Sequence, residues 1–355
     1  MTNFEFPGVQ VSHGEGSAIG LAPYLACAQI VATATALPDT IVSNQDIIDA
    51  YGHQVAAKPI AKMVGVSERR VAPLGVVDTD LLALAARQCL DQAQMRPEQL
   101  SKLIVTKFLG DRTLPMTAAL LQRRLDCGLA VQSFDVDGGI HSFLQALHAA
   151  NCAIGCGDGP ILVVSGGVIN CLVSRTDPRL AFQFGDGAAA VLLAPADRPH
   201  ILANYNFSNY DFVGLQSCPS VRHLVSEKMY DTGQYGPLFD LYQEQNFKSC
   251  KEFAQRAMGV TAEALLAEAQ VKMDDVTLFL ITENHPQISA AIVERLNIAP
   301  SRTLSLRETR GNTMSAMLPM LLDEAIRTGK ARAGALIMLL SLGEGLSGGG
   351  MLIQL

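Results

Sequence analysis

Two stretches of this chain share one pattern: QMRPEQLSKLIV at residues 94–105 and QVKMDDVTLFLI at residues 270–281. Each is typical of a helix end, an acidic turn and a buried apolar strand. The second stretch begins 176 residues after the first, and the same offset separates ILVVS at 161–165 from IMLLS at 337–341. Two matches at one offset indicate an internal duplication.

Helical patterns lie between the paired strands of each half. Apolar residues recur at three- and four-residue spacing in Thr117–Leu125 and again in Ile288–Leu296. The order strand, helix, strand, helix, strand therefore occurs twice. Continuous apolar strands that alternate with helices favour an α/β fold in which helices cover both faces of the sheets. We expect two related α/β halves that pack together as layers.

Changes in composition divide the chain into four expected regions. Residues 1–26 form an N-terminal extension, and residues 27–197 form the first half. Residues 198–250 are rich in Tyr, Asn and Ser and contain Pro219 and Pro237, which predicts a surface excursion or lid. Residues 251–355 form the second half.

Composition excludes several classes of function. The 355 residues are 49% hydrophobic and 17% charged, with a formal net charge of −7 and no run of Lys or Arg. A nucleic-acid partner is not expected, because binding phosphates requires clustered positive charge. The first 35 residues lack Lys and Arg, unlike a secretory signal, and the best apolar run, Ala335–Leu342, is too short for a membrane span. We expect a cytoplasmic protein.

The eight cysteines do not form paired CxxC motifs, so a zinc knuckle is not expected. Reduced and mostly buried thiols are the default in a long cytosolic chain. His141, His148 and Cys152 fall on one face of an expected helix, and Cys156 follows four residues later. This spacing leaves a metal site open as an alternative, but we favour satisfied core side chains and expect no metal.

Four motifs in order make the chain resemble the β-ketoacyl-ACP synthase III family of the thiolase superfamily from Cys27 to Leu355. They are GVSERR at 65–70, FDV at 134–136, FGDGA at 184–188 and RGNT at 310–313. The resemblance implies a thiolase-like fold of five layers, α-β-α-β-α, and a homodimer or heterodimer. It also implies acyl transfer from a thioester on coenzyme A or acyl carrier protein, without a further cofactor.

The family nucleophile is a cysteine at the N-terminus of a buried helix, where the helix dipole favours the thiolate. A gap-free reading through DGGIHSF at 137–143 places Ile140 at this position, and a hydrocarbon cannot attack a thioester. His141 and Ser142 lie about 100° and about 200° around the helix from Ile140. His141 is either a general base or a structural histidine, and Ser142 either lines the site or permits close packing.

The remaining family positions are partly kept. The family histidine falls on Thr282, with His285 either shifted into the same space or capping the helix at Pro286. Asn312 matches the family asparagine, either as a pocket residue or as the fastening of a tight turn. Gly343, Glu344 and Gly345 resemble the glycine-rich oxyanion loop, which would act with the Ile140 amide; a simple turn is the alternative.

Two other differences concern the thioester entrance and the dimer. Pro59 and Met63 stand where the best-known family members carry a Trp and an Arg that contact coenzyme A. The resemblance therefore implies that coenzyme A is bound weakly or not at all. Leu114 matches a residue that reaches into the partner's acyl pocket, and ordinary loop packing is its alternative reading.

Three functions follow from this reading. The first is an acyltransferase that moves an acyl group from a carrier-protein or CoA thioester to a small-molecule acceptor without an acyl-cysteine, with His141 or His285 as base. The second is a catalytically silent subunit that forms a heterodimer with an active homologue. The third is a cysteine-independent decarboxylase of malonyl thioesters. By analogy with the family, secondary metabolism is the expected setting.

Overall fold

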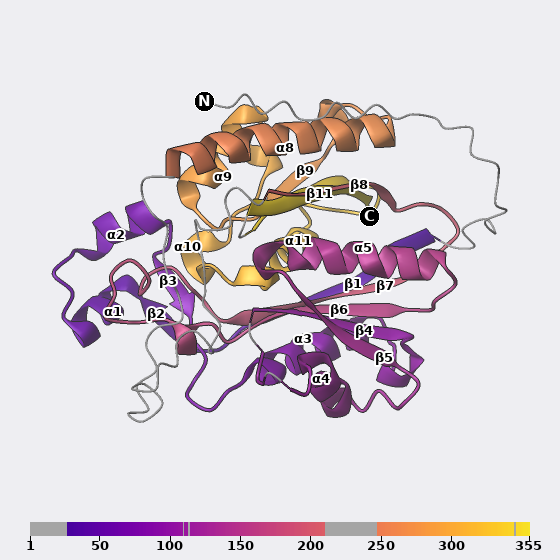
Figure 1. Cartoon of the computed structure of the whole chain (residues 1–355), viewed down its shortest axis with the longest axis horizontal. Helices are drawn as coiled ribbons and strands as arrows, with labels where there is room; N and C mark the ends of the chain where they lie inside the picture. The colour runs from indigo at the N-terminus through magenta and orange to yellow at the C-terminus, as the bar shows by residue number, and fades with distance from the viewer. Residues whose placement is uncertain (1–26, 109, 113, 210–246, 344–345) are drawn as a thin grey trace.

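The protein forms five alternating layers of helices and sheets (Figure 1). This computed structural model describes residues 27–355 except 109, 113, 210–246 and 344–345. The described α-helices are α1 (Asn44–Tyr51), α2 (Ala57–Val64), α3 (Asp78–Gln92), α4 (Thr117–Leu125), α5 (Ser142–Gly155), α8 (Phe247–Ala269), α9 (Pro286–Arg295), α10 (Arg307–Arg310) and α11 (Met317–Arg327).

The first sheet belongs to the N-terminal half. Its order is β1 (Cys27–Ala36), β7 (Gly187–Ala196), β6 (Ile161–Gly167), β4 (Lys102–Lys107) and β5 (Gln132–Asp137). Strands β5, β4 and β6 are parallel, whereas β7 runs antiparallel to both β6 and β1. The parallel strands leave their carboxyl ends on one edge of the layer, where helix α5 begins after β5.

The second sheet repeats this plan with four strands. Its order is β8 (Ile201–Ser208), β11 (Ser347–Gln354), β10 (Leu336–Leu342) and β9 (Leu278–Ile281). Strands β9 and β10 are parallel, and β11 is antiparallel to both β10 and β8. A small separate sheet pairs β2 (Ile41–Ser43) with β3 (Glu68–Arg70).

Alternation along the strands explains the layers. In β6, Ile161 and Val163 face the core between the two sheets, while Leu162 and Val164 face the core under α3 and α4. Strand β10 likewise divides its side chains between the central core and the core under α8 and α9. Because both faces of these strands are buried, their sequences are continuously apolar. Helices α5 and α11 fill the central layer, and the thiolase-like α/β fold expected from the sequence is confirmed.

The internal duplication is visible in the structure. Strands β4 and β9 contain the matched apolar stretches, and each follows a short 3-10 turn, η1 (Pro97–Gln99) or η6 (Met273–Asp275). The helical patterns predicted at Thr117–Leu125 and Ile288–Leu296 correspond to α4 and α9. Helix α9 begins two residues earlier, because Pro286 occupies its first turn, a position that tolerates the missing N–H.

Local capping sets the ends of α1. The Ser43 side chain accepts a hydrogen bond from the Asp46 amide, and the Asp46 carboxylate accepts one from the Ser43 amide at 2.7 Å. Gly52 ends the helix in the left-handed region with φ of 68°. Such a reciprocal box satisfies donors that the first turn of the helix leaves open.

The predicted boundary at residues 198–250 requires a correction. Ile201–Ser208 is not part of a surface excursion, because it forms β8 and pairs along β11. Helix α8 begins at Phe247, so the second half includes both ends of this region. Residues 210–246 and the predicted N-terminal extension 1–26 lie outside the described residues. No helix in the described part of the chain is long and apolar enough to cross a membrane.

Candidate functional site

Ile140 lies where the chain passes from β5 into α5. Gly139, with φ of 58°, starts the short turn η2 (Gly139–His141), and α5 follows at once. The Ile140 side chain is 1% exposed and packs in a cluster with Ile169, Val173, Leu180, Phe184 and Met314. The residue therefore stands at the start of a buried helix, surrounded by hydrocarbon.

The two neighbours of Ile140 do not share its surroundings. Ser142 donates a hydrogen bond from Oγ to the Gly139 carbonyl at 2.7 Å, which fastens the turn. His141 is 1% exposed, and its backbone lies against Gly343 so closely that a Cβ there would be 3.0 Å from the His141 nitrogen. Neither imidazole nitrogen makes a hydrogen bond of standard geometry to a described residue.

The electrostatics of His141 favour a structural role. Burial lowers the pKa of His141 to about 4, and the Asn206 side chain in β8 opposes this shift. The imidazole is therefore neutral at physiological pH. His141 also lies against the second sheet, beside Gly343 at the end of β10. Of the two readings, the structural histidine fits this placement better than the general base.

We expect His141 to make the protein sensitive to acid. A histidine in the unfolded chain has a pKa of about 6.5. Below that pH the unfolded chain therefore binds a proton that the buried imidazole of the native state does not bind. The free energy of unfolding should fall by about 2 kcal/mol from neutral pH to about pH 5 on account of this residue. Chemical denaturation of wild type and His141→Leu at both pH values measures the difference. Parallel pH profiles in the two proteins would contradict the assignment.

Asn312 fastens a tight turn beside Ile140. The backbone N–H of Asn312 donates to the Gln183 carbonyl at 2.8 Å. Its side-chain oxygen accepts a hydrogen bond from the backbone N–H of Met314 at 2.9 Å. Gly311 has φ of 71°, and a Cβ there would lie 3.0 Å from the backbone of residues 183–185. The turn brings Met314 into the cluster around Ile140. Asn312 therefore fastens this turn. Its hydrogen bond from the Met314 amide also helps to hold Met314 in the cluster around Ile140.

Thr282 is anchored to the neighbouring strand. Its Oγ accepts from the Leu342 amide at 3.0 Å, and the residue is 2% exposed. Asn284, which the sequence analysis did not single out, donates to the Leu342 carbonyl at 3.3 Å. Both side chains therefore hold the end of β10, immediately before Gly343. In the sequence, the only feature that pointed to Asn284 is its polar side chain two residues after Thr282.

His285 caps helix α9. Its Nδ1 accepts a hydrogen bond from the Gln287 amide at 3.2 Å, and its ring lies 4.6 Å from the Phe247 ring. Burial, and then the Arg307 charge, lower the pKa of His285 to about 4. Of the two alternatives, the structure places His285 as the cap.

Removing this cap should affect stability rather than chemistry. We expect His285→Ala to lower the free energy of unfolding by about 1 kcal/mol, because an open amide remains at the helix start. His285→Asn restores a side-chain acceptor and serves as the matched control. Urea denaturation measures both. If His285→Asn folds with unchanged stability yet abolishes acyl transfer, the histidine acts as a base instead.

The glycine-rich loop is described only at its first residue. The Gly343 amide donates to the Ser347 carbonyl at 2.8 Å, which closes the turn between β10 and β11. Glu344 and Gly345 lie outside the described residues. The oxyanion arrangement with Ile140 stays a prediction.

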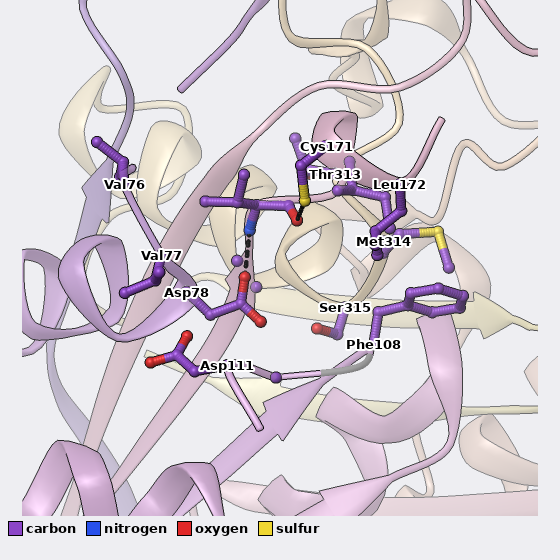
Figure 2. A pocket seen from close by; sticks show the side chains of 15 residues that line it. Val76, Val77, Asp78, Phe108, Asp111, Cys171, Leu172, Thr313, Met314 and Ser315 are labelled. Carbon is purple, nitrogen blue, oxygen red and sulfur yellow. Dashed lines mark hydrogen bonds between the residues drawn. The ribbon is translucent and has the colours of Figure 1, made fainter. Parts of the chain in front are cut away.

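A cavity of about 270 Å³ opens beside the Ile140 cluster (Figure 2). It is lined by residues from several segments: Val76, Val77, Asp78, Phe108, Gly110, Asp111, Gly166, Gly167, Val168, Ile169, Cys171, Leu172, Thr313, Met314 and Ser315. Figure 2 shows Phe108 and Met314 at one end and Asp78 and Asp111 at the other. No sequence motif marked the two aspartates: Asp78 is the first residue of α3, and Asp111 lies in the loop after β4.

Cys171 places a thiol in the wall of this cavity. Its Sγ donates to the Val168 carbonyl at 3.4 Å. Burial raises the pKa of the Cys171 thiol, and the charges of Asp186 and Asp78 raise it further. Because the thiolate is the reactive form, this thiol is poorly suited to attack a thioester.

The other predicted residues lie elsewhere on the molecule. Leu114 is 82% exposed and Met63 on α2, near Pro59, is 58% exposed. Cys152 lies 3.7 Å from His148 Nε2, measured from its Sγ. Cys152 and Cys156 are exposed, so our expectation of satisfied core side chains is wrong for both, because this end of α5 reaches the surface. Among the described residues, no group of three or more His, Cys, Asp or Glu could hold a metal ion.

Comparison with known proteins agrees with the fold. The five layers and the helix-start site define a thiolase-like α/β protein. Family models for 3-oxoacyl-[acyl-carrier-protein] synthase III match residues 134–210, and the model of its C-terminal region matches residues 266–355. These matches and the relatives below show that the chain is similar to 3-oxoacyl-[acyl-carrier-protein] synthase III proteins.

Three relatives illustrate the likeness. The β-ketoacyl-[acyl-carrier-protein] synthase III of Coxiella burnetii is 28% identical over 330 residues, covering 92% of this chain and 99% of the relative. The crystal structure of the Aquifex aeolicus synthase III matches with a TM-score of 0.82 at 26% identity. The match covers 92% of this chain and 100% of that chain. The priming β-ketosynthase of the R1128 polyketide pathway, at 22% identity, 94% and 99% coverage and a TM-score of 0.83, shows the fold alone.

Proposed function

We propose that this protein is an acyltransferase of the synthase III type that works without an acyl-cysteine. An acyl thioester on acyl carrier protein or coenzyme A is the donor, and a small molecule is the acceptor. The acceptor attacks the thioester carbonyl, the carbon–sulfur bond breaks, and the proton released by the acceptor ends on the departing sulfur. Secondary metabolism in the cytoplasm is the proposed setting.

One observation carries this proposal: a cavity opens beside the apolar cluster around Ile140, although residue 140 offers no nucleophile. The cavity is lined in part by Ile169 and Met314, which also contact the Ile140 cluster. Neither His141 nor His285 lines this cavity, so we propose neither histidine as the general base.

The test is acyl transfer by the purified chain. Acyl-CoA and acyl-carrier-protein donors are incubated with panels of amines and alcohols, and product and protein mass are followed. We expect product without a covalent acyl adduct. A long-lived adduct on the protein during turnover would overturn the direct mechanism.

A silent subunit remains the second candidate, favoured by the packing of Ile140. Five buried apolar residues surround it, and Leu114 is exposed as a dimer contact would require. Under this alternative the chain alone is inert, and mixing it with an active homologue restores turnover in a heterodimer.

A further inference from the structure

The cavity beside Ile140 has two chemically different ends. Phe108, Leu172 and Met314 form an apolar end, and Figure 2 shows the carboxylates of Asp78 and Asp111 across the cavity from them. Thr313 and Ser315 add hydroxyl groups, but Ser315 already donates to the Thr106 carbonyl at 3.1 Å. A ligand that fits both ends has an apolar body and a polar head.

The polar end of the cavity carries the negative charges of Asp78 and Asp111, and no positively charged side chain among the described residues lines it. The described residues that line the cavity include neither Lys, Arg nor His. Asp111 accepts from the Thr79 amide at 3.1 Å and from the Thr79 hydroxyl at 2.5 Å. Asp78 accepts from the Val168 amide at 2.6 Å. These are neutral donors, and two neighbouring carboxylates without a cation are costly in a partly buried place.

The backbone makes room for the Asp78 carboxylate. A Cβ on Gly167 would lie 2.5 Å from Asp78 Oδ1, so any larger residue would collide with it. Burial raises the pKa of Asp78 to about 6, and the charges of Asp111 and Asp186 add to the shift. The arrangement therefore holds a carboxylate at the cavity wall despite repulsion, which a cationic ligand would relieve.

We propose that this cavity takes a primary amine with a small apolar body, and that the acyl acceptor is therefore an amine. The identification of the acceptor rests on the proposed acyl transfer, whereas the binding of the amine does not. In the reaction, the bound ammonium first gives one proton to the Asp78 carboxylate in the cavity wall, which later releases it to solvent. The neutral amine nitrogen then attacks the thioester carbonyl and the carbon–sulfur bond breaks. One nitrogen proton goes to the thiolate, leaving an amide and a free thiol.

Binding of three probes of similar shape tests the proposal: phenethylamine, phenethyl alcohol and hydrocinnamate. Isothermal titration of the wild-type chain near neutral pH should show the amine binding at least about tenfold more tightly than the alcohol, and no binding of the carboxylate. Asp78→Asn keeps an oxygen that can accept from Val168 and should remove the preference for the amine. Asp111→Asn should reduce it.

Asp80→Asn is the matched control. Asp80 lies on the same helix, but its carboxylate pairs with Arg124 outside the cavity. This variant should bind the amine as the wild type does. Equal binding of amine and alcohol, or an amine preference that survives Asp78→Asn in a folded protein, would overturn the proposal.

Transfer assays separate the two hypotheses. Acylation of alcohols but not of amines would overturn the amine acceptor and leave the proposed acyl transfer standing. Selective amine binding that depends on Asp78, with no transfer from any donor, would support the ligand class and contradict the proposed function.

Discussion

The Ile140→Cys variant is expected to become acylated when it is mixed with acyl-CoA or acyl-carrier protein, whereas the wild type is not. Residue 140 precedes the 14-residue helix α5, whose N-terminus favours a thiolate. Burial among apolar neighbours opposes ionisation, so acylation should be slower than for a typical activated thiol. Intact-mass spectrometry would show one added acyl group per chain.

The adduct should accumulate, because Thr282 offers no imidazole for later steps. Ile140→Val and Ile140→Ser are the controls: the first has no nucleophile, and the second has a much weaker one. Replacing Ile by Cys should cost about 1 kcal/mol of stability through lost packing, which the fold can tolerate. The gap-free assignment of residue 140 fails if Ile140→Cys reacts with an alkylating reagent but never accepts an acyl group.

Asp186→Ala should produce the largest loss of stability. Asp186 is completely buried and accepts four hydrogen bonds: from the amides of Ala72, Ile169 and Asn170, each at 2.8 Å, and from the Asn170 side chain at 3.0 Å. The alanine variant leaves three backbone donors buried without partners. Each open donor costs about 1–3 kcal/mol, so we expect the free energy of unfolding to fall by at least about 3 kcal/mol.

Urea denaturation tests this expectation. Asp186→Asn keeps one oxygen acceptor and should have an intermediate effect, while the exposed Asp197→Ala should change stability by less than about 0.5 kcal/mol. Ile169, Cys171 and Leu172 line the cavity, so Asp186→Ala should also weaken amine binding. A loss no larger than that of Asp197→Ala would show that the carboxylate does not hold this segment.

Local patterns in the sequence predicted the duplicated strands and helices, whereas the order of five layers was implied by the resemblance to the synthase III family. The repeat at residues 94–105 and 270–281 predicted β4 and β9, and helical spacing predicted α4 and α9. The reason is that a strand buried on both faces must be apolar throughout, a property of neighbouring residues alone. The boundary before β8 was missed, because its polar residues resemble a loop while its backbone completes the second sheet.

The site depended on contacts between distant segments. The sequence offered two roles for His285, and the hydrogen bond from Gln287 places it as a helix cap. The sequence offered a pocket role and a turn role for Asn312, and its effect on Met314 was not predicted. Asp78 and Asp111 carried no motif, since their proximity depends on how the start of α3 and the loop after β4 come together.

The sequence by itself determined the duplicated α/β plan and the hydrocarbon at residue 140, because periodicity and residue identity are local properties. Tertiary structure alone decided that Ile140 is packed by Ile169 and Met314 and that an acid-walled cavity lies beside it. It also decided that His141 is buried against the second sheet. These outcomes depend on which distant side chains share a space, and burial then sets their charge and reactivity.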